Sequence, residues 1–138
     1  MPKRVKILFL CMGNSCRSQI AEGWARHLGG FRLEVYSAGK KAVCVQPRAL
    51  RVMREKGIDI SSQWSKTMDK ICFKDMDYII TLCGDGSLCP DVPATVKRLH
   101  WQVDDPVPVR GTDAEQMDAY RRTRDQMELR VRDFLRAL

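Results

Sequence analysis

An apolar run that leads directly into a compact polar loop constrains this chain more than any other segment. Residues 5–10 read Val-Lys-Ile-Leu-Phe-Leu, and residues 11–18 read Cys-Met-Gly-Asn-Ser-Cys-Arg-Ser. The first stretch predicts a buried strand over residues 4–10, and the second predicts a tight loop with a helix starting near Arg17. Such a loop points backbone N–H groups and the positive helix end toward one place, an arrangement that binds oxyanions.

A cysteine and an arginine bracket five residues of this loop. The Arg17 guanidinium is a planar fork of donors that matches two oxyanion oxygens. The field that binds an anion also favours a thiolate, so we expect Cys11 to be an ionised nucleophile rather than a buried core thiol. Ser18 is expected to donate to the Cys11 sulfur. The expected substrate-binding residues are Met12, Gly13, Asn14, Ser15, Cys16, Arg17 and Ser18.

Strand and helix patterns alternate along the rest of the chain. Strands are predicted at 4–10, 33–37, 78–82 and 96–101, and helices from residue 17 to Gly29-Gly30, from Pro47 to Gly57, at 66–73, and from a Thr112–Glu115 capping box to the end. This order predicts an α/β fold in which residues 1–138 form a single three-layer domain, a four-stranded parallel sheet with helices on both faces. Ligands bind at the carboxyl ends of such strands, where Cys11, Cys83 and Asp104-Asp105 converge.

Charge and cysteine content narrow the function classes. Residues 1–66 hold 13 Lys and Arg against 4 Asp and Glu, which suits an anionic substrate or an acidic partner. No basic and aromatic pattern indicates nucleic-acid binding, and no apolar run approaches the roughly 20 residues that cross a membrane. We therefore expect a cytoplasmic protein, in which six cysteines point to catalysis, redox chemistry or metal binding. The spacings Cys11-x4-Cys16 and Cys83-x5-Cys89 argue against zinc, so no metal site is expected.

Several motifs together resemble one known family. Cys11-x-Gly13-Asn14-x-Cys16-Arg17-Ser18 is similar to the loop of the low-molecular-weight protein tyrosine phosphatase fold family. The stretch Cys-Arg-Ser-Gln-x-Ala-Glu-Gly at 16–23 resembles, more narrowly, the arsenate reductases coupled to thioredoxin. Further matching pieces are Val35-Tyr36-Ser37-Ala38-Gly39, Gly57-Ile58-Asp59-Ile60-Ser61, Thr81-Leu82-Cys83, Cys89-Pro90, and His100-Trp101 with Asp104-Asp105-Pro106. Gln19 instead of Pro, and Val107 instead of Tyr after Pro106, both favour the reductase branch.

This resemblance implies a thiol relay. Cys11 is the implied nucleophile on arsenate or another tetrahedral oxyanion, Asp105 the implied general acid, and Cys83 with Cys89 the implied resolving pair. The five residues between Cys83 and Cys89 are a shorter separation than expected for relatives. No bound cofactor is implied. The implied reductant is external thioredoxin or glutaredoxin, and we expect a monomer.

Two other functions stay open at this point. A low-molecular-weight phosphatase would hydrolyse phosphotyrosine or aryl phosphates through a phosphorylated Cys11 and would need neither Cys83 nor Cys89. A non-enzymatic anion-binding or redox-sensing domain is the more distant alternative, and the presence of Cys11, Arg17 and Asp105 argues against it.

The resemblance also suggests a set of supporting residues behind the loop. One subgroup of the family binds potassium there through residues that match Asn14, Glu22 and Ser37 together with an aspartate. Lys66 stands at the aspartate position, so its ammonium is expected to replace the cation. Cys16 resembles a loop cysteine that turnover does not need, and Cys44 and Cys72 have no expected role.

Overall fold

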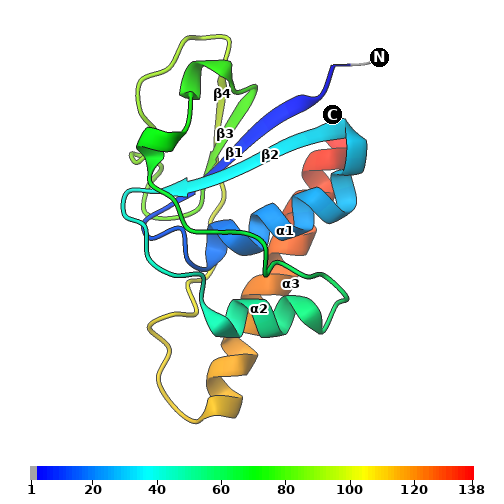
Figure 1. The fold of residues 1–138 in the computed structure, drawn as a ribbon, viewed down its shortest axis with the longest axis vertical. Coiled ribbons are helices and arrows are strands. Elements are labelled where there is room, and N and C mark those ends of the chain that lie inside the picture. The colour runs from blue at the N-terminus through cyan, green and yellow to red at the C-terminus, as the bar shows by residue number, and fades with distance from the viewer. Residues whose placement is uncertain (1–2) are drawn as a thin grey trace.

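The computed structural model describes residues 3–138 as a parallel sheet with helices packed against it (Figure 1). The strands are β1 (Val5–Cys11), β2 (Leu33–Gly39), β3 (Tyr78–Thr81) and β4 (Lys97–His100). The α-helices are α1 (Arg17–Gly29), α2 (Pro47–Arg54) and α3 (Asp113–Ala137), and the 3₁₀ helices are η1 (Gly30–Arg32), η2 (Met68–Lys70) and η3 (Phe73–Asp75). Within the described residues, none of the helices combines the length and the apolar character needed to cross a membrane.

The four strands lie in the order β2-β1-β3-β4, and every pairing is parallel. β1 is central, and its residues Ile7 to Leu10 are almost completely buried. Burial on both faces explains why this strand reads as a continuous apolar run rather than as an alternating pattern. All four residues of β4 are exposed, which agrees with its place at the edge of the sheet.

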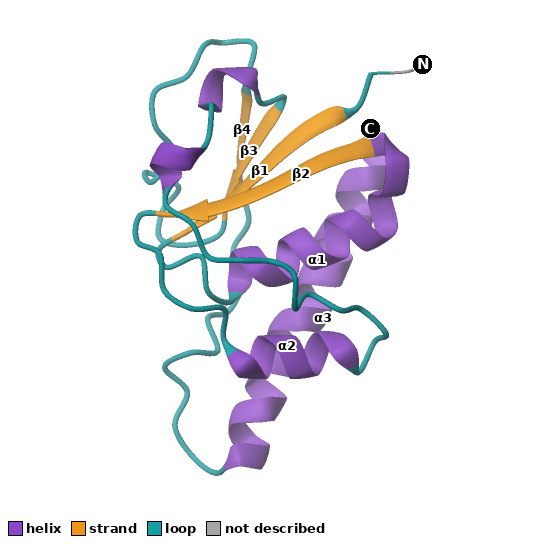
Figure 2. Ribbon diagram, viewed as in Figure 1, coloured by secondary structure: helices purple, strands orange, loops and turns teal. Residues whose placement is uncertain are grey.

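The three α-helices lie on the same side of the sheet, and α2 packs against α1 and α3, as Figure 2 shows. Alternate residues of β1, Ile7 and Phe9, point into the larger hydrophobic cluster together with Trp24 of α1 and Met127 of α3. The Trp24 indole donates to the Arg124 carbonyl at 3.0 Å, which ties α1 to α3 within this cluster.

The opposite face has a thinner cover. Leu8 and Leu10 of β1 point into a smaller cluster that includes Met68, Ile71 and Phe73. The helix predicted at 66–73 is wrong in form, because the segment holds only the single 3₁₀ turns η2 and η3. Helices therefore lie on both faces of the sheet as predicted. One face carries the three α-helices, and the other carries only two short 3₁₀ turns.

The helix boundaries follow the predicted signals. Gly30 ends α1 with φ at 53°, and Gly57 follows α2 with φ at 75°, both in the left-handed region that glycine tolerates. The capping box forms as predicted, since the Thr112 side chain accepts from the Glu115 N–H and the Glu115 side chain accepts from the Thr112 N–H. The apolar residues that recur at helical spacing along α3 pack into the core: Met117, Tyr120, Met127 and Val131 are buried and Phe134 packs against them, whereas Leu138, just after the helix, is 45% exposed.

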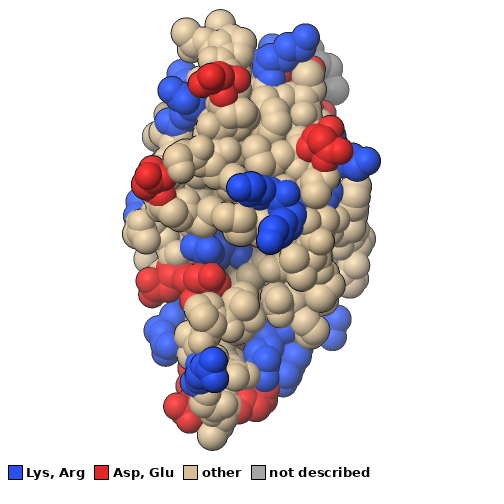
Figure 3. All heavy atoms as spheres, turned by 90° about the vertical axis from the view of Figure 1, so that its left-hand side faces the viewer, with Lys and Arg blue, Asp and Glu red and all other residues tan. Residues whose placement is uncertain are grey.

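The carboxyl ends of the parallel strands meet at one edge of the sheet. Figure 3 looks from that side of the molecule and shows Lys and Arg side chains near the centre of the face, with Asp and Glu toward its margins. The anion loop, residues 12–16, follows β1 at this edge, and α1 begins directly after it.

Candidate active site

The anion loop wraps the N-terminal end of α1. Cys11 is the last residue of β1 and is 4% exposed, and Asn14 is fully buried. Asn14 has φ at 47°, a left-handed conformation that asparagine tolerates better than most residues. The loop thus turns tightly enough for its backbone to face the start of the helix, where an anion is favoured.

Ser18 holds the Cys11 sulfur through a short chain of hydrogen bonds. Ser18 Oγ lies 2.9 Å from Cys11 Sγ and accepts from Asn14 Nδ2 at 2.8 Å. The Asn14 amide is oriented by its other end, because Oδ1 accepts from the Lys66 backbone N–H at 2.8 Å. With its oxygen already accepting, the Ser18 hydroxyl is free to donate to the sulfur.

A neighbouring segment, residues 41–46, pairs with the anion loop along its length. The N–H groups of Lys41, Val43 and Gln46 donate to the carbonyls of Met12, Gly13 and Ser15, respectively. Sequence reasoning missed this brace. One signal could have indicated it. Gly39 ends β2 beside Cys11, so the residues that follow Gly39 and the loop that follows Cys11 leave the sheet at the same edge.

Gln19 is a second brace that the sequence did not reveal. Its side chain is buried, and Nε2 donates to the carbonyls of Asn14 at 3.0 Å and Trp64 at 3.2 Å. Its Oε1 accepts from Gln63 Nε2 at 2.8 Å. Gln19 therefore fastens the loop to the segment that carries Lys66.

Arg17 joins the loop to the ends of two other strands. Its Nη1 donates to the Leu82 carbonyl at 2.8 Å and to the Val103 carbonyl at 3.4 Å. Its Nη2 lies 3.4 Å from Asp105 Oδ2. The carbonyl contacts fix the plane of the guanidinium, so the remaining donors are held beside the loop.

Asp104 and Asp105 point in different directions. Asp105 faces Arg17, and its other oxygen accepts from the Val107 N–H at 3.0 Å. The Asp104 carboxylate instead accepts from Gln126 Nε2 at 2.9 Å, on α3. Of the two, only Asp105 therefore stands next to Arg17, while the Asp104 side chain is hydrogen-bonded to α3.

Three thiols stand close to the anion loop or to the segment after β3. Burial raises the pKa of the Cys16 thiol far above its ordinary value. Burial also raises the pKa of Cys83, with a further upward effect from the charge of Cys11, while Arg17 and the Met12 backbone act in the opposite direction. Burial likewise raises the pKa of Cys89, against a lowering effect of Arg98.

The two thiols of the expected resolving pair pack against different hydrophobic clusters. Cys83 packs against the larger hydrophobic cluster, and Cys89 packs against the smaller cluster on the other face. In the described chain all six cysteines are free thiols. Cys44 and Cys72 are exposed.

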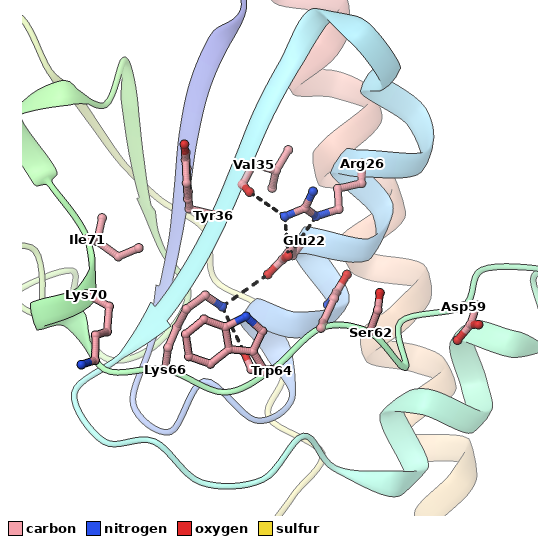
Figure 4. A pocket seen from close by; sticks show the side chains of 11 residues that line it. Glu22, Arg26, Val35, Tyr36, Asp59, Ser62, Trp64, Lys66, Lys70 and Ile71 are labelled. Carbon is pink, nitrogen blue, oxygen red and sulfur yellow. Dashed lines mark hydrogen bonds and ion pairs between the residues drawn. The ribbon is translucent and has the colours of Figure 1, made fainter.

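A charged cluster lies behind the loop, in a hollow of about 670 Å³ between α1, β2 and residues 59–71 (Figure 4). Its centre is the buried Glu22 carboxylate, which accepts from Ser37 Oγ and from Arg26 Nε. Lys66 Nζ lies 4.0 Å from Glu22 Oε1 and donates to the Trp64 carbonyl at 2.9 Å. Burial lowers the pKa of Lys66, and the nearby Glu22 charge raises it.

The cluster contains the supporting residues expected from the sequence. Glu22, Ser37 and the Lys66 ammonium lie together, and the Lys66 backbone reaches Asn14. Among the described residues, no group of three or more His, Cys, Asp and Glu side chains is arranged to hold a metal ion.

Comparison with known proteins gives a consistent result. The model of a family described as low molecular weight phosphotyrosine protein phosphatase matches residues 6–138. An arsenate reductase of Halalkalibacterium halodurans is 47% identical over 135 residues, which are 97% of this chain and 96% of that protein. A solved arsenate reductase in the oxidized state superposes with a TM-score of 0.83 at 34% identity, over 96% of this chain and 97% of the other. A thioredoxin-dependent arsenate reductase of Corynebacterium glutamicum gives a TM-score of 0.73 at 27% identity, over 99% of this chain and 63% of the other.

Proposed function

The chain belongs to the low molecular weight phosphotyrosine protein phosphatase family, and we infer that within this family it is an arsenate reductase. One observation in the site carries this inference. A second thiol, Cys83, stands at the same end of the sheet as Cys11, because Leu10 of β1 pairs with Thr81 of β3, and it lines a hollow together with Met12 of the anion loop. Hydrolysis of a phosphoenzyme uses water and needs no such thiol, whereas reduction needs a source of two electrons.

The first proposed step is attack on arsenate by the Cys11 thiolate. The anion loop and Arg17 hold the arsenate oxygens, and a sulfur–arsenic bond forms as one oxygen leaves. Asp105, beside Arg17, gives its proton to a leaving hydroxyl group of the arsenate, which departs as water. Ser18 donates to the sulfur and so favours the thiolate before attack.

The second step transfers electrons. Cys83 attacks the Cys11 sulfur, a disulfide forms, and the sulfur–arsenic bond breaks with its electron pair remaining on arsenic. Arsenic(V) becomes arsenic(III), and arsenite is released. The two thiols lose the two electrons that arsenic gains.

The third step frees Cys11. Cys89 attacks the Cys83 sulfur, a Cys83–Cys89 disulfide forms, and Cys11 leaves as a thiolate. The two thiols pack against different hydrophobic clusters and are not bonded to each other in this structure, so residues 84–88 are proposed to change conformation first. Gly84 and Gly86 have φ at 62° and 91°, so the segment contains two residues that cross between backbone regions at little steric cost.

An external dithiol completes the cycle by reducing the Cys83–Cys89 disulfide. Thioredoxin is the proposed reductant, in line with the thioredoxin-dependent relative, and glutaredoxin is the alternative. Such a cycle needs a reducing compartment, so the cytoplasm is the proposed location.

Behind the loop, the Lys66 ammonium is proposed to take the place of a potassium ion. Its positive charge faces the buried Glu22 carboxylate, while its backbone N–H fixes the Asn14 amide. Both effects keep Ser18 aimed at the Cys11 sulfur.

The test is arsenate-dependent oxidation of NADPH with thioredoxin and thioredoxin reductase, run beside glutaredoxin and its reductase. We expect turnover with thioredoxin, and none for Cys11→Ser, because a serine hydroxyl is not ionised at neutral pH. Arg17→Lys should be severely impaired, since a point charge cannot replace the guanidinium fork. Absence of arsenate turnover, together with efficient hydrolysis of an aryl phosphate, would favour the phosphatase activity that the family description names.

A further inference from the structure

The segment that carries Asp105 is fastened to α3 through its neighbour, Asp104. All three hydrogen-bonding groups of Asp104 are engaged by two residues of that helix. Thr123 Oγ1 donates to the Asp104 carbonyl at 2.8 Å. Gln126 Oε1 accepts from the Asp104 N–H at 3.1 Å, and Gln126 Nε2 donates to the Asp104 carboxylate at 2.9 Å.

These three hydrogen bonds of Asp104 to Thr123 and Gln126, called the clasp below, depend on the spacing of the two helix residues. Positions 123 and 126 are three residues apart and lie on the same side of a helix. Thr123 is fully buried, so its hydroxyl has no solvent alternative to the Asp104 carbonyl. The Gln126 amide meets a donor and an acceptor of the same residue, and this pair fixes the direction of the backbone that enters Asp105.

Beyond Asp104 the segment borders a hollow on the α3 side, although Pro106 itself is buried. A hollow of about 300 Å³ separates Pro106 and Val109 from Ala119 and Thr123 of α3. An unfilled space offers few van der Waals contacts to resist a shift of the loop. The hydrogen bonds of Asp104 therefore restrain the segment on the α3 side, in addition to the direct contacts of Asp105 with Arg17 and the Val107 N–H.

We propose that Gln126, supported by Thr123, is a positioning residue for proton delivery by Asp105. Gln126 touches neither the anion loop nor Arg17, and it acts through the Asp104 backbone and carboxylate. A general acid must lie within hydrogen-bond reach of the leaving oxygen, so a loosened loop lowers the rate of the chemical step and leaves anion binding unchanged. This inference rests on the proposed function, because that function gives Asp105 its role.

The experiment measures kcat for arsenate and the inhibition constant of inorganic phosphate in Gln126→Leu. We expect kcat to fall about tenfold, one decade of the contribution of about 10²–10⁴ that a general acid makes. The phosphate inhibition constant should stay unchanged. Gln116→Leu is the matched control, because it makes the same change on the same helix away from Asp104, and it should keep full activity.

A double-mutant cycle separates positioning from general damage. In an Asp105→Asn background Gln126→Leu should have no further effect, since there is no acid left to position. Asp104→Ala removes only the carboxylate contact of the clasp and keeps the Asp104 N–H bond to Gln126 and the carbonyl bond to Thr123, so it should lower kcat by less than Gln126→Leu does. Asp104→Asn keeps an oxygen that accepts from Gln126 Nε2, and should recover most of the turnover that Asp104→Ala loses.

Three results would overturn the proposal: full kcat in Gln126→Leu, a tenfold loss that persists in the Asp105→Asn background, or weaker phosphate inhibition in step with kcat. If the unmodified protein does not reduce arsenate, the proposed function fails by itself. In that case kcat for hydrolysis of phenyl phosphate is measured in the same set of variants, because the leaving group of phenyl phosphate also needs a proton. The inference about Gln126 therefore stands or falls separately.

Discussion

Replacing Gly39 with alanine tests whether the end of β2 sets the shape of the anion loop. A Cβ atom at this position would lie 2.7 Å from the Asn14 nitrogen, 2.8 Å from the Lys41 carbonyl oxygen and 2.8 Å from the Met12 carbonyl oxygen. All three are backbone atoms, and ordinary Cβ contacts begin at 3.4 Å. Relief therefore requires the loop, or its brace, to move by more than half an ångström.

The size of the effect follows from this displacement. Forcing an extra methyl group into a packed site costs about 1–3 kcal/mol of folding stability. A misplacement of about 1 Å in a catalytic group costs up to about 10²-fold in rate. We expect Gly39→Ala to fold, to unfold several degrees lower, and to lose about 10–100-fold in kcat/KM for arsenate.

The assay combines thermal unfolding, arsenate turnover and inhibition by inorganic phosphate. Gly30→Ala is the control, because Gly30 has φ at 53° and no heavy atom near its Cβ position. That change should cost about 1–2 kcal/mol through the left-handed backbone alone and leave turnover and phosphate inhibition intact. If Gly39→Ala is as active as Gly30→Ala, the close approach of β2 does not control the loop.

Three further predictions follow from the site and its surroundings. Cys83→Ser and Cys89→Ser should each block multiple-turnover reduction while leaving hydrolysis of an aryl phosphate largely intact, and native-rate reduction by Cys83→Ser would refute the relay. Turnover and melting temperature should not change when potassium is exchanged for a bulky organic cation at fixed ionic strength and fixed anion, whereas Lys66→Asp should create a potassium response. Hydrogen bonds from Arg121 lower the pKa of Glu55 to about 2 from 4.5, so its contribution to stability is present above about pH 4.5 and is lost as the pH falls toward 2. Melting curves of Glu55→Gln should therefore depend less on pH in that window than those of the unmodified protein.

The sheet and the α-helices were predictable because each has a local signal. β1 reads as a buried strand, α3 opens with a capping box, and Gly30 ends α1. The α-helix expected at 66–73 does not form, and the cause is a contact with a segment distant in sequence, which no local pattern reveals. The Gly39 N–H donates to the Lys66 carbonyl, and Gly39 forms a parallel bridge with Thr67, so this segment is held extended beside β2 before the first 3₁₀ turn begins.

The residues of the site divide in the same way, into those with a local sequence signal and those placed by contacts between distant segments. Cys11, Arg17 and Asp105 were identified from spacing and resemblance, and the structure brings Arg17 to Asp105 and Cys11 to Ser18. The braces of the loop were missed, because they are polar contacts between segments far apart in sequence. Gln19 donates to the Trp64 carbonyl, 45 positions away in the sequence, and a contact of this kind produces no periodic pattern from which it could be predicted.

The sheet topology explains how a second thiol comes to lie at the edge of the sheet that carries the anion loop. β1 and β3 are neighbouring parallel strands, and Leu10 pairs with Thr81. Cys11 follows Leu10 directly, and Cys83 follows Thr81 after one residue, so the pairing itself brings both sulfurs to the same end of the sheet. Cys89 gains no such placement from the register, because it lies beyond a glycine-containing segment and against the opposite face. The fold therefore places the first two thiols at one end of the sheet, and in the proposed relay the third reaches them through motion of residues 84–88.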